Sequence, residues 1–263
     1  MLGRSDAASQ TCGRERMGNP ITWFEILGPD PEQTATFYSE LFGWHTQTMD
    51  GGYILIDTHS GSGMNGGIGQ PPADGQPGTV FYVESPDIQA LLDKAESHGG
   101  KTVMPVTEIP EMVTYASFTD PWGNLIGLMK GDGSGSPVSA GDNPPVDWVE
   151  IACNKPQKAW DFYRELFGWT VGGDMSSEGG GPVHGSIDTG SKLGARGGIG
   201  SSPDGKPRVD IYAAVDDLTK YLERAEGLGA RIAMPAMKVD EHTEIAMFTD
   251  PQGTTFGLYA SSN

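Results

Sequence analysis

Two strand-like segments carry the same pair of an aromatic and an acidic side chain. Trp23 and Glu25 lie in the segment ITWFEI, and Trp148 and Glu150 lie in VDWVEI. Side chains two residues apart on a strand point to one face, so each Trp shares a face with its Glu. An indole floor beside a carboxylate could stack on a flat ligand and hold a positive group through charge-assisted hydrogen bonds. In the alternative interpretation, the Trp is core and the Glu bonds to neighbouring backbone.

A histidine and two carboxylates form a second candidate set. His184 occupies the position that Tyr53 occupies 131 residues earlier. Together with Asp210 and Glu150, His184 could abstract a proton or hold a metal in an unusual site, which makes these three the candidate catalytic residues, with no role assigned. Alternatively, His184 lies beside glycines and is merely exposed. The other histidines fall on predicted turns or element ends and are expected at the surface: His45, His59, His98 and His242.

These residues recur because the chain is internally duplicated. The segment FYSELFGW at 37–44 returns as FYRELFGW at 162–169, which is 125 residues later. Further along, GGIG at 66–69 returns at 197–200, and FTDP at 118–121 returns at 248–251, at offsets of 131 and 130. We therefore place a few extra residues of the second copy in a glycine-rich loop near 177–181. Neither GGIG segment precedes a helix start with Lys-Ser/Thr, so a phosphate-binding loop is not indicated. We interpret these glycines as strand residues that let a ligand or the facing sheet approach closely.

The hydrophobic periodicity changes in a fixed order within each copy. Asp30-Pro31 predicts a helix start, apolar residues at helical spacing follow, and Gly43 is a plausible stop. A short strand precedes this helix and three follow it. The same order then returns, with a helix expected over 87–98. The recurring Met104-Pro105 and Met234-Pro235 are interpreted as strand ends. Four β-α-β-β-β units in an α+β chain are therefore predicted.

The repeat and the composition divide the chain. Residues 1–18 have no apolar stretch for a secretory signal and are predicted to form a disordered tail. The first copy spans 19–130 and the second 146–263. Between them, 131–145 consists mainly of Gly, Ser, Pro, Asp and Asn, which predicts a flexible linker that is also the preferred internal site of proteolysis.

The charge balance excludes several classes of protein. The 263 residues include 17 Lys+Arg and 35 Asp+Glu, a net charge of −18, which would repel nucleic acid. We find no apolar run of about 18 residues or more that could cross a bilayer. Two cysteines suit a reducing compartment, so a cytoplasmic location is expected. The expected partner is a small molecule, and a monomer and a homodimer are both left open.

The motifs of both copies, namely Asp-Pro, Phe-Tyr, Leu-Phe-Gly-Trp and a late Asp-Pro-x-Gly-(x)3-Gly-Leu, resemble the vicinal oxygen chelate superfamily. That superfamily includes glyoxalase, the bleomycin-resistance proteins and extradiol dioxygenases. The resemblance extends from about residue 20 to about residue 260. It implies two tandem glyoxalase-like domains, each a curved mixed sheet around a cavity with helices outside.

The resemblance also implies where a metal would bind in each domain. By their own motifs, the ligand positions hold Trp23, Val80 and Gly127 in the first copy, and Trp148, Asp210 and Gly257 in the second. Trp, Val and Gly offer no ligand to a divalent cation, so we expect no metal and no cofactor.

The sequence leaves two classes of function open. The first is a metal-free protein of the bleomycin-resistance type that binds an aromatic or cationic compound. The alternative is a lyase, isomerase or oxygenase with a displaced metal or acid/base site in the second copy, and whether the protein is an enzyme is left undecided. If catalysis resides in the second copy, the first copy is expected to bind a flat apolar ligand or to be filled by Trp23. The candidate ligand-binding residues are Trp23, Glu25, Tyr53, Tyr82, Trp148, Glu150, His184, Asp210 and Tyr212.

Overall fold

The computed structural model describes residues 18–72, 75–172, 183–202 and 204–262. The predicted tail over 1–18, except for Gly18, and the predicted loop near 177–181 lie outside the described residues. No helix in the described part of the chain is long and apolar enough to cross a membrane.

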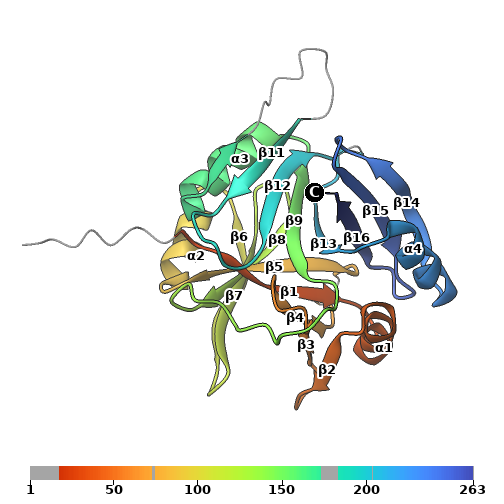
Figure 1. Cartoon of the computed structure of the whole chain (residues 1–263). Coiled ribbons are helices and arrows are strands. Elements are labelled where there is room, and N and C mark those ends of the chain that lie inside the picture. Colours follow the sequence, from red (N-terminus) through yellow and green to blue (C-terminus); the bar gives the residue numbers. More distant parts are fainter. Residues whose placement is uncertain (1–17, 73–74, 173–182, 203, 263) are drawn as a thin grey trace, which may run out of the picture.

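Each copy forms one sheet with two helices (Figure 1). The first copy contains β1 (Ile21–Leu27), α1 (Pro31–Phe42), β2 (His45–Thr48), β3 (Ile54–Asp57), β4 (Asn65–Gly69), β5 (Gly78–Ser85), α2 (Ile88–Ser97), β6 (Lys101–Ile109), β7 (Val113–Thr119) and β8 (Leu125–Lys130). The second contains β9 (Val146–Cys153), α3 (Pro156–Phe167), β10 (Thr170–Gly172), β11 (His184–Asp188), β12 (Arg196–Ser201), β13 (Arg208–Ala214), α4 (Leu218–Gly227), β14 (Arg231–Lys238), β15 (Thr243–Thr249) and β16 (Thr255–Ser261).

The strand order is the same in both sheets. It runs β2-β3-β4-β1-β5-β8-β7-β6 in the first sheet and β10-β11-β12-β9-β13-β16-β15-β14 in the second. The two units of a copy meet where β1 pairs antiparallel with β5, while β1 pairs parallel with β4. The predicted α+β fold with four β-α-β-β-β units is confirmed.

Local signals set the ends of α1 as predicted. The Asp30 side chain accepts a hydrogen bond from the Gln33 backbone N–H, and Pro31 opens the helix. Gly43 follows with φ of +79°, the left-handed conformation that glycine adopts without strain. After this cap, β2 begins two residues later, at His45.

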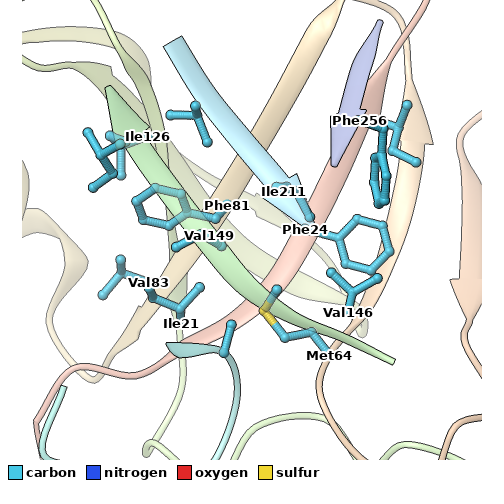
Figure 2. Packing of buried hydrophobic residues seen from close by; sticks show 14 of the residues in the cluster. Ile21, Phe24, Met64, Phe81, Val83, Ile126, Val146, Val149, Ile211 and Phe256 are labelled. Atoms are coloured by element: carbon cyan, nitrogen blue, oxygen red, sulfur yellow. The ribbon is translucent and has the colours of Figure 1, made fainter. Parts of the chain in front are cut away.

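One face of each sheet forms a core that the two copies share. Phe24 and Val149, from β1 and β9, belong to the same buried cluster (Figure 2). The first helix of each copy packs on the other copy: Tyr38 of α1 lies 5.3 Å from Phe256 between ring centroids, and Phe162 of α3 lies 6.4 Å from Phe118. The opposite face of each sheet, which we call the open face, is therefore left to carry the candidate site residues.

The linker 131–145 makes defined contacts with the first copy. The Gly133 N–H donates to Glu84 Oε1 at 2.7 Å, and Trp44 Nε1 donates to the Pro144 carbonyl at 3.0 Å. The flexibility and the domain boundary stay predictions, which limited proteolysis can test.

The structure corrects two predicted strand ends. Met104-Pro105 does not end a strand, because β6 continues to Ile109, and Met234-Pro235 does not, because β14 continues to Lys238. The pairing with β7 shifts register between Met104 and Thr107, and β6 is an edge strand. An irregular edge strand tolerates a residue that lacks a backbone N–H, which explains why Pro105 lies inside the strand.

Candidate functional site

The open face of the first sheet gathers four of the predicted residues around one carboxylate. The Tyr53 hydroxyl donates to Glu25 Oε1 at 2.8 Å, and the Tyr82 hydroxyl donates to Glu25 Oε2 at 2.7 Å. Trp23 Nε1 donates to the Tyr53 hydroxyl oxygen at 3.3 Å. Trp23, Glu25 and Tyr53 are half-buried and Tyr82 is buried. The predicted shared face of Trp23 and Glu25 is thus confirmed.

Strand register and one glycine position the two tyrosines. Tyr82 lies directly opposite Trp23 on β5, so both reach the same face. Tyr53 immediately precedes β3, and its ring passes over Gly67 of β4. A Cβ atom at Gly67 would lie 2.0 Å from the Tyr53 hydroxyl oxygen, so any other residue there would displace the ring.

Burial sets the electrostatics of this group. It raises the pKa of the Glu25 carboxyl group, while the hydrogen bonds from Tyr82 and Tyr53 act in the opposite direction. Burial, followed by the charge of Glu25, raises the pKa of Tyr53 and of Tyr82, so both stay protonated donors. In the described part of the chain, no basic side chain forms an ion pair with Glu25.

Apolar side chains pack around the group, and two hollows reach its outer members. Trp23, Tyr115, Leu125 and Met129 pack against the small buried cluster of Leu27, Val80 and Tyr82. A hollow of about 450 Å³ reaches Trp23 and is also lined by Gln47, Leu55 and Asp57. A second hollow of about 540 Å³ reaches Tyr53 and Gly69. Both hollows are open to solvent, and they reach the group at Trp23 and at Tyr53.

The open face of the second sheet presents a different arrangement. His184 Nε2 lies 3.1 Å from Glu150 Oε2, and Trp148 Nε1 donates to the same oxygen at 3.4 Å. The hydrogen bond with Glu150 raises the pKa of His184. A Cβ atom at Gly198 would lie 2.4 Å from both the Glu150 carboxylate and the His184 ring. Gly198, like Gly67, therefore leaves space for the side chains that lie over it.

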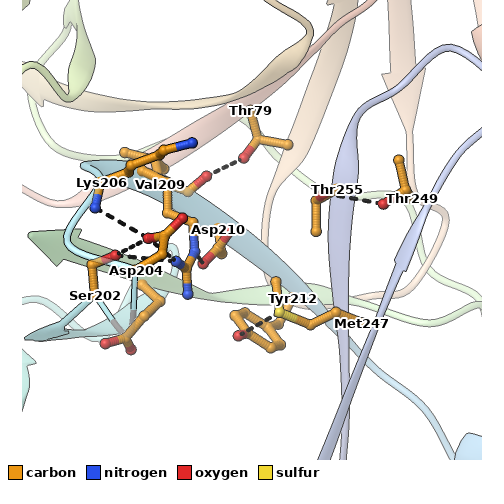
Figure 3. A network of polar contacts seen from close by, with 12 residues as sticks. Thr79, Ser202, Asp204, Lys206, Val209, Asp210, Tyr212, Met247, Thr249 and Thr255 are labelled. Carbon is orange, nitrogen blue, oxygen red and sulfur yellow. Dashed lines mark hydrogen bonds and ion pairs between the residues drawn. The ribbon is translucent and has the colours of Figure 1, made fainter. Parts of the chain in front are cut away.

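Asp210 does not join His184 and Glu150. Arg208 Nε donates to Asp210 Oδ2 at 2.6 Å, and the Asp210 side chain is only 3% exposed. Figure 3 shows Asp210 within a polar network and Tyr212 beside Met247. The Tyr212 hydroxyl donates to Met247 Sδ at 3.7 Å, with no hydrogen bond to Glu150. The set of His184, Glu150 and Asp210 expected from the sequence is therefore only partly assembled.

Two arginines of the second open face were missed by the sequence reasoning. Arg208 lies two residues before Asp210 on one strand, and this spacing could have revealed the pair. The Arg196 guanidinium lies 5.8 Å from the Trp148 ring centroid and 3.9 Å from the Asp147 carboxylate. The signal for Arg196 is weak because it depends on the register between β12 and β9, where Arg196 is opposite Trp148.

The predicted surface histidines are mostly confirmed. His45, His98 and His242 are exposed. His59 is half-buried instead, because its ring stacks on that of His45 with centroids 4.8 Å apart.

The comparisons with known proteins agree with this architecture. Residues 21–128 and 146–258 each match the Glyoxalase/Bleomycin resistance protein/Dioxygenase superfamily. The chain belongs to this superfamily. It is 25% identical to "Putative glyoxylase CFP32" of Mycobacterium tuberculosis, over 92% of this chain and 95% of that protein. It is 26% identical to the "Anthracycline biosynthesis protein DnrV" of Streptomyces peucetius, over 90% and 91%.

Solved structures show the same fold at lower identity. The Mn(II)-bound glyoxalase of Novosphingobium aromaticivorans aligns with a TM-score of 0.64 at 15% identity, over 93% of this chain and 82% of that one. Likeness at this level of identity concerns the fold alone, and the chemistry must be argued from the residues present.

The residues present do not fit the superfamily's usual metal. Even a Cβ atom at Gly127 would lie 2.3 Å from Tyr82 Cδ1, and one at Gly257 would lie 2.2 Å from Tyr212 Cδ1. The tyrosine rings thus fill the space of a third ligand. Among the described residues, no three His, Cys, Asp or Glu side chains group closely enough to hold a metal ion.

Proposed function

We propose that this superfamily member binds a small aromatic or cationic compound on the open face of its first sheet, without the usual metal site. The observation that carries the proposal is the Glu25 carboxylate, held by two tyrosine hydroxyls beside the Trp23 indole. No basic side chain of the described residues pairs with Glu25.

Among the described residues, this carboxylate has no positive partner. A charge among apolar groups is unfavourable unless it is paired, and burial already raises the pKa of Glu25. A positive group on a ligand would supply the pair. The negative faces of aromatic rings add to this attraction, and Trp23 offers a flat surface for stacking.

The names of the relatives bear on both candidate functions. DnrV is named as an anthracycline biosynthesis protein, and an anthracycline has a flat polycyclic ring system. A flat ring system is the kind of ligand that an indole floor accommodates. CFP32 is named as a glyoxylase, which keeps the enzyme class as a second candidate.

Tryptophan fluorescence tests the binding proposal. We expect a panel of aromatic cations to quench the wild-type protein and Trp148→Phe alike, whereas Trp23→Phe loses most of the quenching. Quenching that disappears only in Trp148→Phe would contradict the placement on the first sheet. Elemental analysis of protein purified without chelator is expected to find far less than one Zn, Fe, Mn or Ni per chain, and about one per chain would contradict the metal-free part.

The contact between His184 and Glu150 favours an acid/base enzyme as the second candidate. Glu150 orients the ring through Nε2 and favours its protonated form, while His184 is half exposed and able to reach a ligand. Loss of turnover in His184→Ala, with Asp210→Asn affecting stability more than turnover, would support a lyase, isomerase or oxygenase here. If turnover survives His184→Ala, this candidate is wrong. The cytoplasmic location and the oligomeric state stay predictions.

A further inference from the structure

The two open faces differ in how many carboxylates they carry at matched positions. Glu25 lies opposite Val80 across β1 and β5, and Glu150 lies opposite Asp210 across β9 and β13. These two pairs occupy the same place in the two sheets. The first open face therefore has one carboxylate where the second has two.

The second open face also supplies a base for each of these carboxylates. His184 replaces Tyr53 and contacts Glu150 at 3.1 Å. Arg208 takes the place of Gly78 at the start of the strand and donates to Asp210 at 2.6 Å. Both carboxylates of the second copy thus have a basic partner within the chain.

The same contrast holds for the indole rings. Arg196 lies over Trp148 at 5.8 Å and within 3.9 Å of the Asp147 carboxylate. The first copy has Asn65 opposite Trp23, and no cation of the described residues lies over that ring. A positive ligand approaching Trp148 must displace Arg196, whereas one approaching Trp23 meets no competing cation from the part of the chain that the structure describes.

We infer that the two halves have diverged into sites of different charge selectivity: the first open face takes a monocationic aromatic ligand, and the second takes an uncharged aromatic one. This inference rests on the proposed function and assigns a ligand class to each half. In the first half, the ligand's charge completes an ion pair with Glu25. In the second, basic side chains of the protein already contact both carboxylates, so a ligand's charge gains little.

Two flat probes that differ in charge test the inference, namely 1-methylquinolinium and quinoline. At about pH 8 quinoline is uncharged, and this pH lies well above the ordinary pKa of a glutamic acid side chain. Calorimetric titration measures both affinities in wild type, Glu25→Gln and Glu150→Gln. These matched variants remove one charge and keep the shape of the side chain.

We expect Glu25→Gln to weaken 1-methylquinolinium binding by tenfold or more and to change quinoline binding by less than about twofold. Glu150→Gln should not lower the preference for the cation. If Glu150→Gln lowers that preference as much as Glu25→Gln does, the inference is overturned. If both probes bind the wild type equally and Glu25→Gln changes neither affinity, the inference fails while binding of aromatic compounds stands. If neither probe binds, the proposed function fails as well.

A reciprocal variant makes a further test. Four substitutions together, namely His184→Tyr, Arg196→Asn, Arg208→Gly and Asp210→Val, give the second open face the side chains of the first at these positions. We expect the combined variant to gain a second binding site for 1-methylquinolinium. A folded variant that binds only one equivalent would contradict the inference, and if the variant does not fold, the two single substitutions still decide.

Discussion

Gly127→Ala probes the space that the superfamily's third metal ligand would need. The added Cβ atom would lie 2.3 Å from Tyr82 Cδ1 and 2.4 Å from Cε1. Ordinary contact begins near 3.4 Å, so the ring must move by about 1 Å. Tyr82 is 6% exposed and its hydroxyl is bound to Glu25 at 2.7 Å, so the ring has little room to move.

Three effects determine how much Gly127→Ala changes the free energy of unfolding. Overpacking a buried site costs about 1–3 kcal/mol, and weakening the Tyr82 hydrogen bond adds about 1 kcal/mol. The lower backbone entropy of alanine in the unfolded chain offsets about 0.4–1 kcal/mol of this. We therefore expect Gly127→Ala to lower the free energy of unfolding by about 1–3 kcal/mol, which corresponds to roughly 2–4 °C in Tm per kcal/mol.

Gly78→Ala is the matched control, because a Cβ atom at Gly78 would meet nothing within 4 Å. It should leave stability unchanged or raise it by up to about 1 kcal/mol. Urea unfolding followed by circular dichroism measures both variants, and a double-mutant cycle with Tyr82→Ala isolates the contact. In the Tyr82→Ala background, Gly127→Ala should lose most of its effect. Equal urea midpoints for Gly127→Ala and Gly78→Ala would refute the argument that Tyr82 fills the ligand space.

Three further predictions concern the shared core, the second open face and the linker. The Tyr163 hydroxyl donates to Asp120 at 2.8 Å and both are buried, so Tyr163→Phe should lower the free energy of unfolding by about 1–3 kcal/mol; an unchanged urea midpoint would contradict this. The hydrogen bond with Glu150 raises the pKa of His184 in the folded protein. The pair therefore stabilises the fold fully below the unfolded-state pKa of about 6.5, and this stabilisation is lost as pH rises through the folded-state pKa. His184 is half exposed, so we expect less than about 1 kcal/mol, and an NMR titration of His184 that shows no upward shift would contradict the contact. Limited proteolysis should cut first within 131–145, and a first cut inside either copy would contradict the domain boundary.

Much of the fold follows from the sequence because its signals are local. Asp30 and Gly43 bound α1 through interactions within one helical turn. Alternation along β1 places Trp23 and Glu25 on one face, since successive side chains of a strand point to opposite sides. The repeat of both patterns in the second copy then implies the same units there. None of these conclusions needs a contact between distant residues.

The contacts at the candidate site depend on tertiary structure. His184, Asp210 and Glu150 all belong to the second open face, yet Asp210 pairs with Arg208 and only His184 reaches Glu150. Alternation determines the face of a side chain, whereas strand order, register and side-chain rotamers determine its partner. No local pattern in the sequence contains that information.

The shared core shows the same limit on a larger scale. The apolar stripe of α1 indicates that Tyr38 is buried, and this is correct. That Tyr38 packs on Phe256 of the other copy was decided only when the two sheets came together. Apolar burial is non-directional, so the sequence of α1 specifies a buried face without specifying which surface covers it.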